Sequence, residues 1–511
     1  MPPSTIFHLG HIVAVLRRSP ASVEHHHRHH AVVLTELIPD TLLDRSPGIV
    51  IELNVNFFEI TAFPNTSNKD ELETPLLMPE EEEGPTASLL DQGSPEPTPR
   101  LRLPPPKFGE LITVLSIDGG GIHGLIPTVV LKCLEEKLQA IDGEDARIAD
   151  YFDVIAGMRV GASIATMLAS PNMDKRTKYT LHEIQDFYVN NGPNIFPSKR
   201  WWRRPLDLLI ASRGPKYDGT FLQKNKIKEV TGERTLRKLV APMFDANILE
   251  PLIFSSFQDA VQELVEEAGP DMPNVCIGPP ATAMPTYFPA HYFDILASDM
   301  EPAKYHLIDG GNNPTMAAIS KITREQLLKN PEFHPSGMDY MKYLVISVGA
   351  WCAVHENVPA KQGAFNWFHS RRNSHSPVTD TSSHASAVLA DWQVRMLLHN
   401  GNRVRKQNYL YIQALAPLFG EAILPMDNAT SKNMADVLDI GYKLLAEKVA
   451  MVDLTTGKYE TVEDENAPTN DAELQCFSEL LVAERNLRLK ERQRQRQGEE
   501  QNGVHSLNII E

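Results

Sequence analysis

Short apolar runs alternate with helical patterns from about residue 108 onward. "ELITVLSI" (residues 110–117) is β-branched and apolar, as in a strand buried on both faces, and residues 126–141 space their apolar positions like an amphipathic helix. A second strand, turn and helix pattern covers residues 151–170, and a third begins at Tyr305 with "YHLIDGGNNPTMAAISKI". This alternation predicts an α/β fold in which helices cover both faces of a mostly parallel sheet.

The first part of the chain follows no such alternation. Residues 64–106 are crowded with proline and acidic side chains, and "EHHHRHH" (residues 24–30) is typical of a solvated low-complexity tract, with loose metal binding as the alternative. Residues 48–63 are rich in β-branched and aromatic side chains, which predict a strand or two without an evident partner. We therefore expect residues 1–106 to form a divergent and largely disordered extension.

The compact domain is expected at residues 107–497, with a short tail at residues 498–511. Near its end, "ERNLRLKERQRQRQ" (residues 484–497) closes a helical pattern with dense arginine. These cations complement the dipole of a solvated terminal helix. A basic face that touches anionic lipid is the alternative.

Composition narrows the class of partner. The chain has 511 residues, is 42% hydrophobic and carries a net charge of −17, which argues against a nucleic-acid surface and favours small molecules, lipids or proteins. Its 4 cysteines lie far apart, without the spacing of a zinc site or a disulfide framework. "IVAVLRR" (residues 12–18) is too short for a secretory leader, and no apolar run approaches the roughly 18–20 residues of a membrane span. We expect a cytoplasmic protein, for which peripheral membrane contact and the oligomeric state stay open.

The glycine-rich turn "DGGGIHG" (residues 118–124) fits two kinds of site. Its glycines match G-x-G-x-x-G between a strand and a helix, as in dinucleotide-binding proteins. That chemistry needs an acidic residue about 20 positions on, at the end of a second strand. Glu135 and Glu136 instead lie in a helical pattern, which makes nucleotide binding the less favoured interpretation. The same backbone amides suit an oxyanion hole for acyl transfer.

An oxyanion hole requires a nucleophile and a base nearby. Gly157 and Gly161 bracket a tight strand-to-helix turn, as in G-x-S-x-G nucleophile elbows, and Asp309 follows the strand "YHLI". All three turns are expected at the carboxyl ends of sheet strands, where such folds bind ligands. No turn carries a histidine suited to a triad, so the pattern predicts a Ser/Asp pair. The position between the two glycines, however, holds Arg159.

Several longer motifs resemble those of the plant patatin-like proteins, a family of lipid acyl hydrolases. They are "VLSIDGGGIHGLIP", "DARIADYFDVIAG", "GPKYDG", "PTYFPAHYF" and "NYLYIQ", and the resemblance extends from about Val114 to Leu489, with a motif core at residues 114–322. The family implies a three-layer α/β patatin fold and hydrolysis of phospholipids, galactolipids and other acyl esters by a Ser/Asp dyad, without metal or cofactor. It also implies roles in lipid degradation and plant defence. The implied partners are membrane glycerolipids or fatty-acyl esters, not nucleic acid.

The resemblance also assigns roles to residues of this chain. They are the proton acceptor Asp309, the oxyanion-hole glycines Gly119, Gly120 and Gly121, the elbow glycines Gly157 and Gly161, the Asp-turn glycines Gly310 and Gly311, and Arg159 at the nucleophile position.

The chain departs from the family at the position where chemistry occurs. The family's elbow reads G-T-S-T-G-G, whereas this chain reads G-M-R-V-G-A. Arginine provides neither hydroxyl nor thiol, and its guanidinium stays protonated, so no acyl-enzyme can form on it. The Asp turn is also three residues shorter than usual, because Gly311 runs directly into Asn312. Displacement of Asp309 therefore stays open.

We expect a family member whose ester hydrolysis is absent or strongly impaired. If the fold is retained, Arg159 projects toward Asp309 and pairs with it, since a buried guanidinium needs a carboxylate; an exposed surface arginine is the competing expectation. Three further functions stay open: a lipid-binding pseudoenzyme, a nucleotide-binding protein, and an active hydrolase with Ser163, Ser116 or Cys352 as nucleophile. Both serines are expected to face the packed interior.

Overall fold

The chain forms two compact units, Met1–Pro95 and Glu96–Glu511. The computed structural model describes residues 6–9, 12–18, 49–54 and 102–507. Within the last range, the residues outside the description are 198–214, 218, 220–236, 257–282, 286, 296–302, 311–312, 334–338, 351–376, 399–407, 415–417, 419–425, 454, 457–458 and 463–464. Among the helices described, none has the length and apolar character that a membrane crossing requires.

The first unit contains a small antiparallel sheet. Its strands are β1 (Ile6–Leu9), β2 (Ile12–Arg18) and β3 (Ile49–Asn54), in the order β1-β2-β3. The expectation that the β-branched run near residue 50 has no partner is therefore wrong, because β3 pairs with β2 over its full length. The partner is "IVAVLRR", whose own β-branched residues suit a strand. The histidine tract and the proline-rich run up to residue 101 lie outside the described residues.

The second unit is built on a mixed sheet of eight strands in the order β11-β10-β4-β5-β6-β9-β8, with β7 paired to β6. Pairing is parallel from β11 through β6 and antiparallel for β7, β8 and β9, so the prediction of a mostly parallel sheet is confirmed. The strands are β4 (Ile112–Ile117), β5 (Val154–Gly157), β6 (Lys238–Asp245), β7 (Glu250–Ser255), β8 (His291–Ile295), β9 (Ala303–Asp309), β10 (Tyr343–Gly349) and β11 (Tyr409–Gln413). A separate hairpin joins β12 (Ala450–Val452) and β13 (Tyr459–Thr461).

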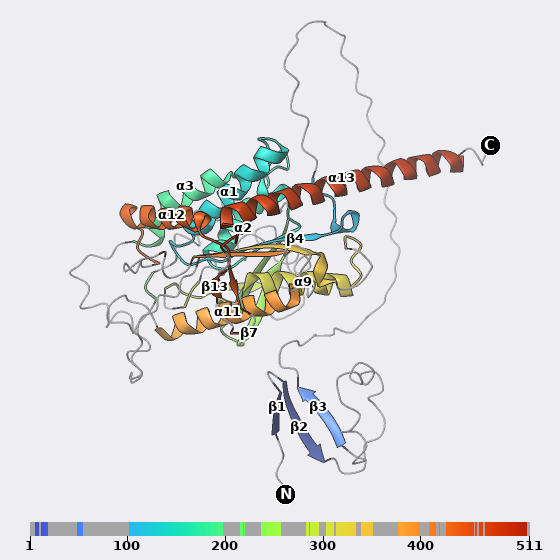
Figure 1. Cartoon of the computed structure of the whole chain (residues 1–511). Coiled ribbons are helices and arrows are strands. Elements are labelled where there is room, and N and C mark those ends of the chain that lie inside the picture. The colour runs from blue at the N-terminus through green and yellow to red at the C-terminus, as the bar shows by residue number, and fades with distance from the viewer. Residues whose placement is uncertain are drawn as a thin grey trace. The chain divides into compact units, whose positions relative to one another are not determined.

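Helices cover both faces of this sheet, as Figure 1 shows. One layer holds α1 (Leu125–Asp142), α2 (Val160–Ala169), α3 (Leu181–Ile195), α12 (Ser431–Ala446) and α13 (Asn470–Leu507). The other holds α9 (Pro314–Leu327) and α11 (Pro377–Leu398). Side chains alternate along β4 accordingly: Leu115 and Ile117 join the core under the first layer, and Ile112 and Val114 join the core under the second. The three-layer α/β architecture is thus confirmed.

The register along β6 brings Asp309 close to the turn after β5. β5 pairs with the beginning of β6, up to Ala156 opposite Val240, and β9 pairs with its end, where Asp309 lies opposite Met243. β7 occupies the other edge of β6, so β5 and β9 share a single edge and approach each other from opposite directions. Asp309 therefore ends its strand just beyond the carboxyl end of β5.

The arginine-rich terminal helix is only partly solvated, which corrects the expectation for residues 484–497. Arg488 of α13 is fully buried, where it pairs with Asp153 at 2.6 Å and with Glu484 at 2.7 Å. It also donates to the carbonyl oxygens of Pro104 and Leu111, at 3.0 and 2.6 Å. The helix thereby fastens the end of the unit to its first residues, and it continues past residue 497 without a break.

Candidate functional site

The turn between β5 and α2 has the backbone of a tight elbow. Arg159 sits at the N-cap of α2 with φ of 53°, in the left-handed region that side-chain-bearing residues rarely adopt. A Cβ atom at Gly157 would lie 2.4 Å from the carbonyl oxygen of Gly161, and one at Gly161 would lie 2.1 Å from that of Ile117. Any larger residue at either position would clash. The elbow geometry is therefore retained although its central residue has changed.

The glycine-rich loop after β4 packs directly against this elbow. A Cβ at Gly119 would lie 2.4 Å from the backbone nitrogen of Val160, and Gly121 has φ of 60° with no room for a Cβ beside the carbonyl oxygen of Met426. Gly120 lies between them, with space for a Cβ. Gly119 thus lies against the turn that holds the assigned nucleophile position, and Gly120 and Gly121 follow it in the loop. The oxyanion-hole role of the three glycines stays a prediction.

Arg159 and Asp309 form a buried ion pair. Arg159 Nε donates to Asp309 Oδ2 at 2.6 Å, and the two side chains are only 6% and 3% exposed. The contact expected from sequence is present, although the Asp turn is three residues shorter than in the family. Gly310 permits the close approach, because a Cβ there would lie 2.9 Å from the backbone of Met243. Gly311 lies outside the described residues.

A second carboxyl group lies within the electrostatic range of Arg159. Asp118 directly follows β4 and is 5% exposed, and its Oδ1 atom has no hydrogen-bond partner among the described residues. Burial raises the pKa of Asp118 from 3.8 to about 7; the positive charge of Arg159 opposes this shift and the negative charge of Asp391 adds to it. Sequence patterns alone gave no reason to assign a role to this residue.

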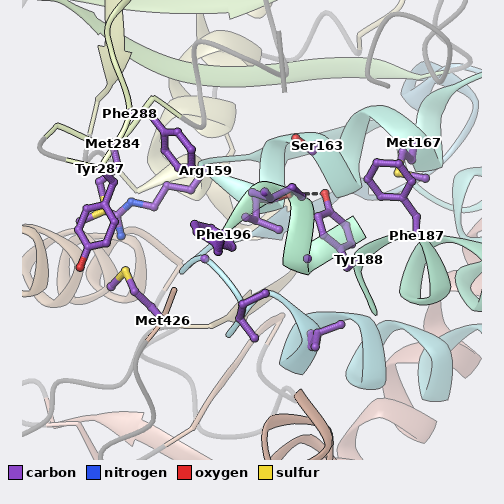
Figure 2. A pocket seen from close by; sticks show the side chains of 16 residues that line it. Arg159, Ser163, Met167, Phe187, Tyr188, Phe196, Met284, Tyr287, Phe288 and Met426 are labelled. Carbon is purple, nitrogen blue, oxygen red and sulfur yellow. Dashed lines mark hydrogen bonds between the residues drawn. The ribbon is translucent and has the colours of Figure 1, made fainter. Parts of the chain in front are cut away.

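A largely apolar pocket opens beside Arg159, as Figure 2 shows. Arg159 extends toward one end, near Tyr287 and Met426, and Phe187 and Met167 lie at the other end. The residues that line the pocket are Gly121, Ile122, Leu125, Arg159, Val160, Ser163, Met167, Phe187, Tyr188, Gly192, Ile195, Phe196, Met284, Tyr287, Phe288 and Met426. Such a lining suits a hydrocarbon chain, and it offers little to a nucleotide.

An aromatic cluster and an ion pair support one wall of the pocket. Phe196, Tyr217 and Phe288 pack in edge-to-face and tilted arrangements with ring centroids 5.6 to 5.8 Å apart. The hydroxyl of Tyr217 donates to Asp427 at 2.8 Å, and Lys216 pairs with the same carboxylate. Lys216 and Tyr217 belong to the motif "GPKYDG", which in the sequence supported only the family resemblance. The adjacent charged and aromatic residues of this motif were the sequence signal that could have pointed to their role in the pocket wall.

The alternative nucleophiles meet different outcomes. Ser116 is fully buried in β4, as expected. Ser163 is also buried, yet it lines the pocket, so the expectation that it faces only packed interior is wrong. Cys352 lies outside the described residues. Among the described side chains, no group of three or more His, Cys, Asp or Glu residues is arranged to hold a metal ion.

Comparison of the sequence with known proteins shows the family of this chain. The family model for patatin-like phospholipase matches residues 115–319. Patatin-like protein 2 of Oryza sativa subsp. indica is 36% identical over 401 residues, covering 76% of this chain and 96% of that protein. Patatin-like protein 2 of Arabidopsis thaliana is 36% identical over 407 residues, with the same two coverages of 76% and 96%. Among solved structures, VipD from Legionella pneumophila matches with a TM-score of 0.22 and 11% identity, covering 66% of this chain and 67% of that chain.

Proposed function

The chain belongs to the patatin-like phospholipase family, and we propose that it is a member that binds acyl lipids while its ester hydrolysis is lost or strongly impaired. The family supplies the reaction class, which is hydrolysis of carboxylic esters of lipids. The proposal departs from that reaction because of one observation, the 2.6 Å contact between Arg159 Nε and Asp309 Oδ2.

This contact acts against both halves of the family's chemistry. At the elbow, a guanidinium cannot attack a carbonyl carbon, since it is protonated at every usable pH. The Asp309 carboxylate, which the resemblance assigns as the base, is bound to that guanidinium. The serine hydroxyl from which it would take a proton is absent. Loss of the serine in other hydrolases lowers kcat by about 10⁶. What remains is assistance from the glycine loop to a water molecule.

Binding does not depend on the missing nucleophile. The pocket beside the elbow is lined by aromatic, aliphatic and methionine side chains, which match an acyl chain. The positive charge of Arg159 at one end of that pocket favours the carbonyl or carboxylate end of a lipid over its methyl end. The ligands of this proposal are membrane glycerolipids or fatty-acyl esters, reached by peripheral contact with a membrane.

Two measurements on the full chain test the proposal. Incubation with a p-nitrophenyl acyl ester should release p-nitrophenol no faster than the Arg159→Ala variant does, and a fluorophosphonate probe should label no residue. Isothermal titration with stearate should show saturable binding. Turnover together with labelling of Ser163 or another residue would establish an active hydrolase with a different nucleophile, and absence of binding would refute the lipid-binding half.

A further inference from the structure

Ser163 is a buried hydroxyl inside the pocket that the mechanism of the family does not use. It lies in the first turn of α2, four residues after the N-cap residue Arg159, and both residues line the pocket. Its side chain lines the pocket, the residue is 7% exposed, and Oγ has no hydrogen-bond partner among the described residues. In Figure 2 it lies between the Arg159 end of the pocket and the end formed by Met167 and Phe187.

Two other buried hydroxyls, one in α2 and one at its C-cap, each donate to the carbonyl oxygen four residues before them. Thr166 donates to the carbonyl oxygen of Ala162, and Ser170 donates to that of Thr166, both at 2.7 Å. The equivalent acceptor for Ser163 would be the carbonyl of Arg159, four residues before it. That carbonyl accepts from the backbone amide of Ala162 at 3.1 Å, and Ser163 Oγ makes no hydrogen bond to it. Ser163 therefore lacks the bond that Thr166 and Ser170 make.

Among the described residues that line the pocket, Tyr188 carries the hydroxyl on which Ser163 acts. Burial raises the pKa of Tyr188, and the Ser163 hydroxyl, which approaches the Tyr188 oxygen as a hydrogen-bond donor, lowers it to a smaller extent. Tyr188 itself donates to the carbonyl oxygen of Val160 at 3.4 Å, and no described group lies at full hydrogen-bond distance and angle from Ser163 Oγ. Apart from Arg159 and Tyr287, the other side chains that line the pocket are hydrocarbon or thioether. A polar group left unbonded in such a place raises the free energy of the protein, and a ligand that bonds to it removes that penalty.

We infer that the pocket selects acyl chains that carry an oxygen atom along the chain, as a hydroxyl, keto or epoxide group, and that Ser163 binds this oxygen. The inference rests on the proposed function, because it assumes that the pocket holds an acyl chain with its carboxyl end toward Arg159. The oxygen then belongs a short distance from the carboxyl end, since Ser163 is one helical turn from Arg159. Sites that hydrogen-bond a ligand hydroxyl discriminate strongly against the analogue that lacks it.

The test compares stearate with a series of hydroxystearates whose hydroxyl is placed at successive carbons from the carboxyl end. Isothermal titration of the full chain should show at least one hydroxystearate, with its hydroxyl near the carboxyl end, that binds about tenfold more tightly than stearate, equivalent to 1.4 kcal/mol. In Ser163→Ala this preference should disappear while stearate still binds. Thr166→Val removes a hydroxyl of α2 that is already bonded, so it should keep the preference.

The outcomes separate the inference from the function on which it rests. If stearate and every hydroxystearate bind equally, or if the preference survives in Ser163→Ala, the inference is wrong and lipid binding stands. If no fatty acid binds at all, the proposed function fails and the inference fails with it. Circular dichroism and the thermal midpoint of each variant show whether it is folded, and only folded variants enter the comparison.

Discussion

Arg159 combines an unfavourable backbone conformation with a charge that is almost fully buried. Both features are energetically unfavourable, and neighbouring residues compensate for both. Gly157 and Gly161 make room for the turn, and Asp309 neutralises the guanidinium. A buried ion pair of this kind contributes little by itself, because desolvation offsets the Coulombic attraction. Loss of only one partner, however, leaves an unpaired charge in the interior.

Asp309→Ala should therefore lower the free energy of unfolding by about 3–5 kcal/mol, since it strands the Arg159 guanidinium. The double variant Arg159→Met/Asp309→Ala removes both charges and should recover most of that loss. Urea unfolding of the two variants and the unmodified chain measures the difference. Equal losses for the single and double variants would show that the stability effect comes from packing and not from charge.

Asp118 should make stability depend on pH in the opposite direction to an ordinary paired carboxylate. Its pKa is about 7 in the folded chain against 3.8 for an exposed aspartate, so between these values the folded state holds a proton that the unfolded state has released. The protonated Asp118 therefore adds its full contribution to the free energy of unfolding below about pH 4. This contribution, on the order of a few kcal/mol, is lost as pH rises to about 7. Arg159 and Asp391 are the charges that act on it.

The measurement is the difference in unfolding free energy between the unmodified chain and Asp118→Asn, followed from pH 4 to pH 8. Relative to this variant, the unmodified chain should lose stability steadily up to about pH 7 and then level off. A difference that does not change with pH would mean that the folded protein does not hold the Asp118 proton in this range.

At the scale of elements, one fully buried arginine of α13, Arg488, connects that helix to the sheet. Arg488 donates to Asp153, to Glu484 and to two carbonyl oxygens that precede β4, and the Asp153 carboxylate accepts in turn from the backbone and hydroxyl of Thr113. The network links the last helix with the two central strands of the sheet. Loss of the arginine would therefore take a donor from two buried carboxylates at once.

Arg488→Met keeps the approximate length of the side chain but removes all of these donors, so it should lower unfolding free energy by about 3–5 kcal/mol. Arg494→Met, on the exposed part of the same helix, should change it by less than about 0.5 kcal/mol. Guanidinium unfolding followed by circular dichroism compares the two variants. A similar small effect of both would show that α13 is held by its apolar contacts alone.

Sequence patterns predicted the positions of the strands better than the directions in which the strands run. The apolar runs before the three glycine-bearing turns do form β4, β5 and β9, because a buried strand leaves a strong local signal. The same signal carries no information on strand direction, and β9 turned out to be antiparallel to β6, reaching the site from the opposite end. The pairing of Arg159 with Asp309 was predictable from charge and burial. The unbonded hydroxyl of Ser163 was not, because it depends on which side chains of other elements reach the pocket.

At the scale of the whole molecule, the site belongs entirely to the second unit. Every residue that lines the pocket, and both members of the ion pair, lie within Glu96–Glu511. The central sheet and both of its helical layers also lie there, so this unit contains its own hydrophobic core.

A chain reduced to Glu96–Glu511 should accordingly unfold at the same denaturant midpoint as the full chain and bind stearate with an unchanged Kd. Chemical unfolding and isothermal titration of both forms provide the comparison. A large loss of stability or of affinity on removing Met1–Pro95 would show that the first unit contributes to the core or to the site.

The central claim is that Arg159, in an elbow that keeps both of its turn glycines, prevents ester hydrolysis at this site. The most direct measurement is the rate of p-nitrophenyl ester hydrolysis by Arg159→Ser, beside Arg159→Ala and the unmodified chain. Because Asp309 already lies beside the elbow, serine at this position should raise the rate roughly 10²-fold or more above Arg159→Ala and become labelled by a fluorophosphonate probe. A folded Arg159→Ser variant that is no faster than Arg159→Ala and remains unlabelled would contradict the account.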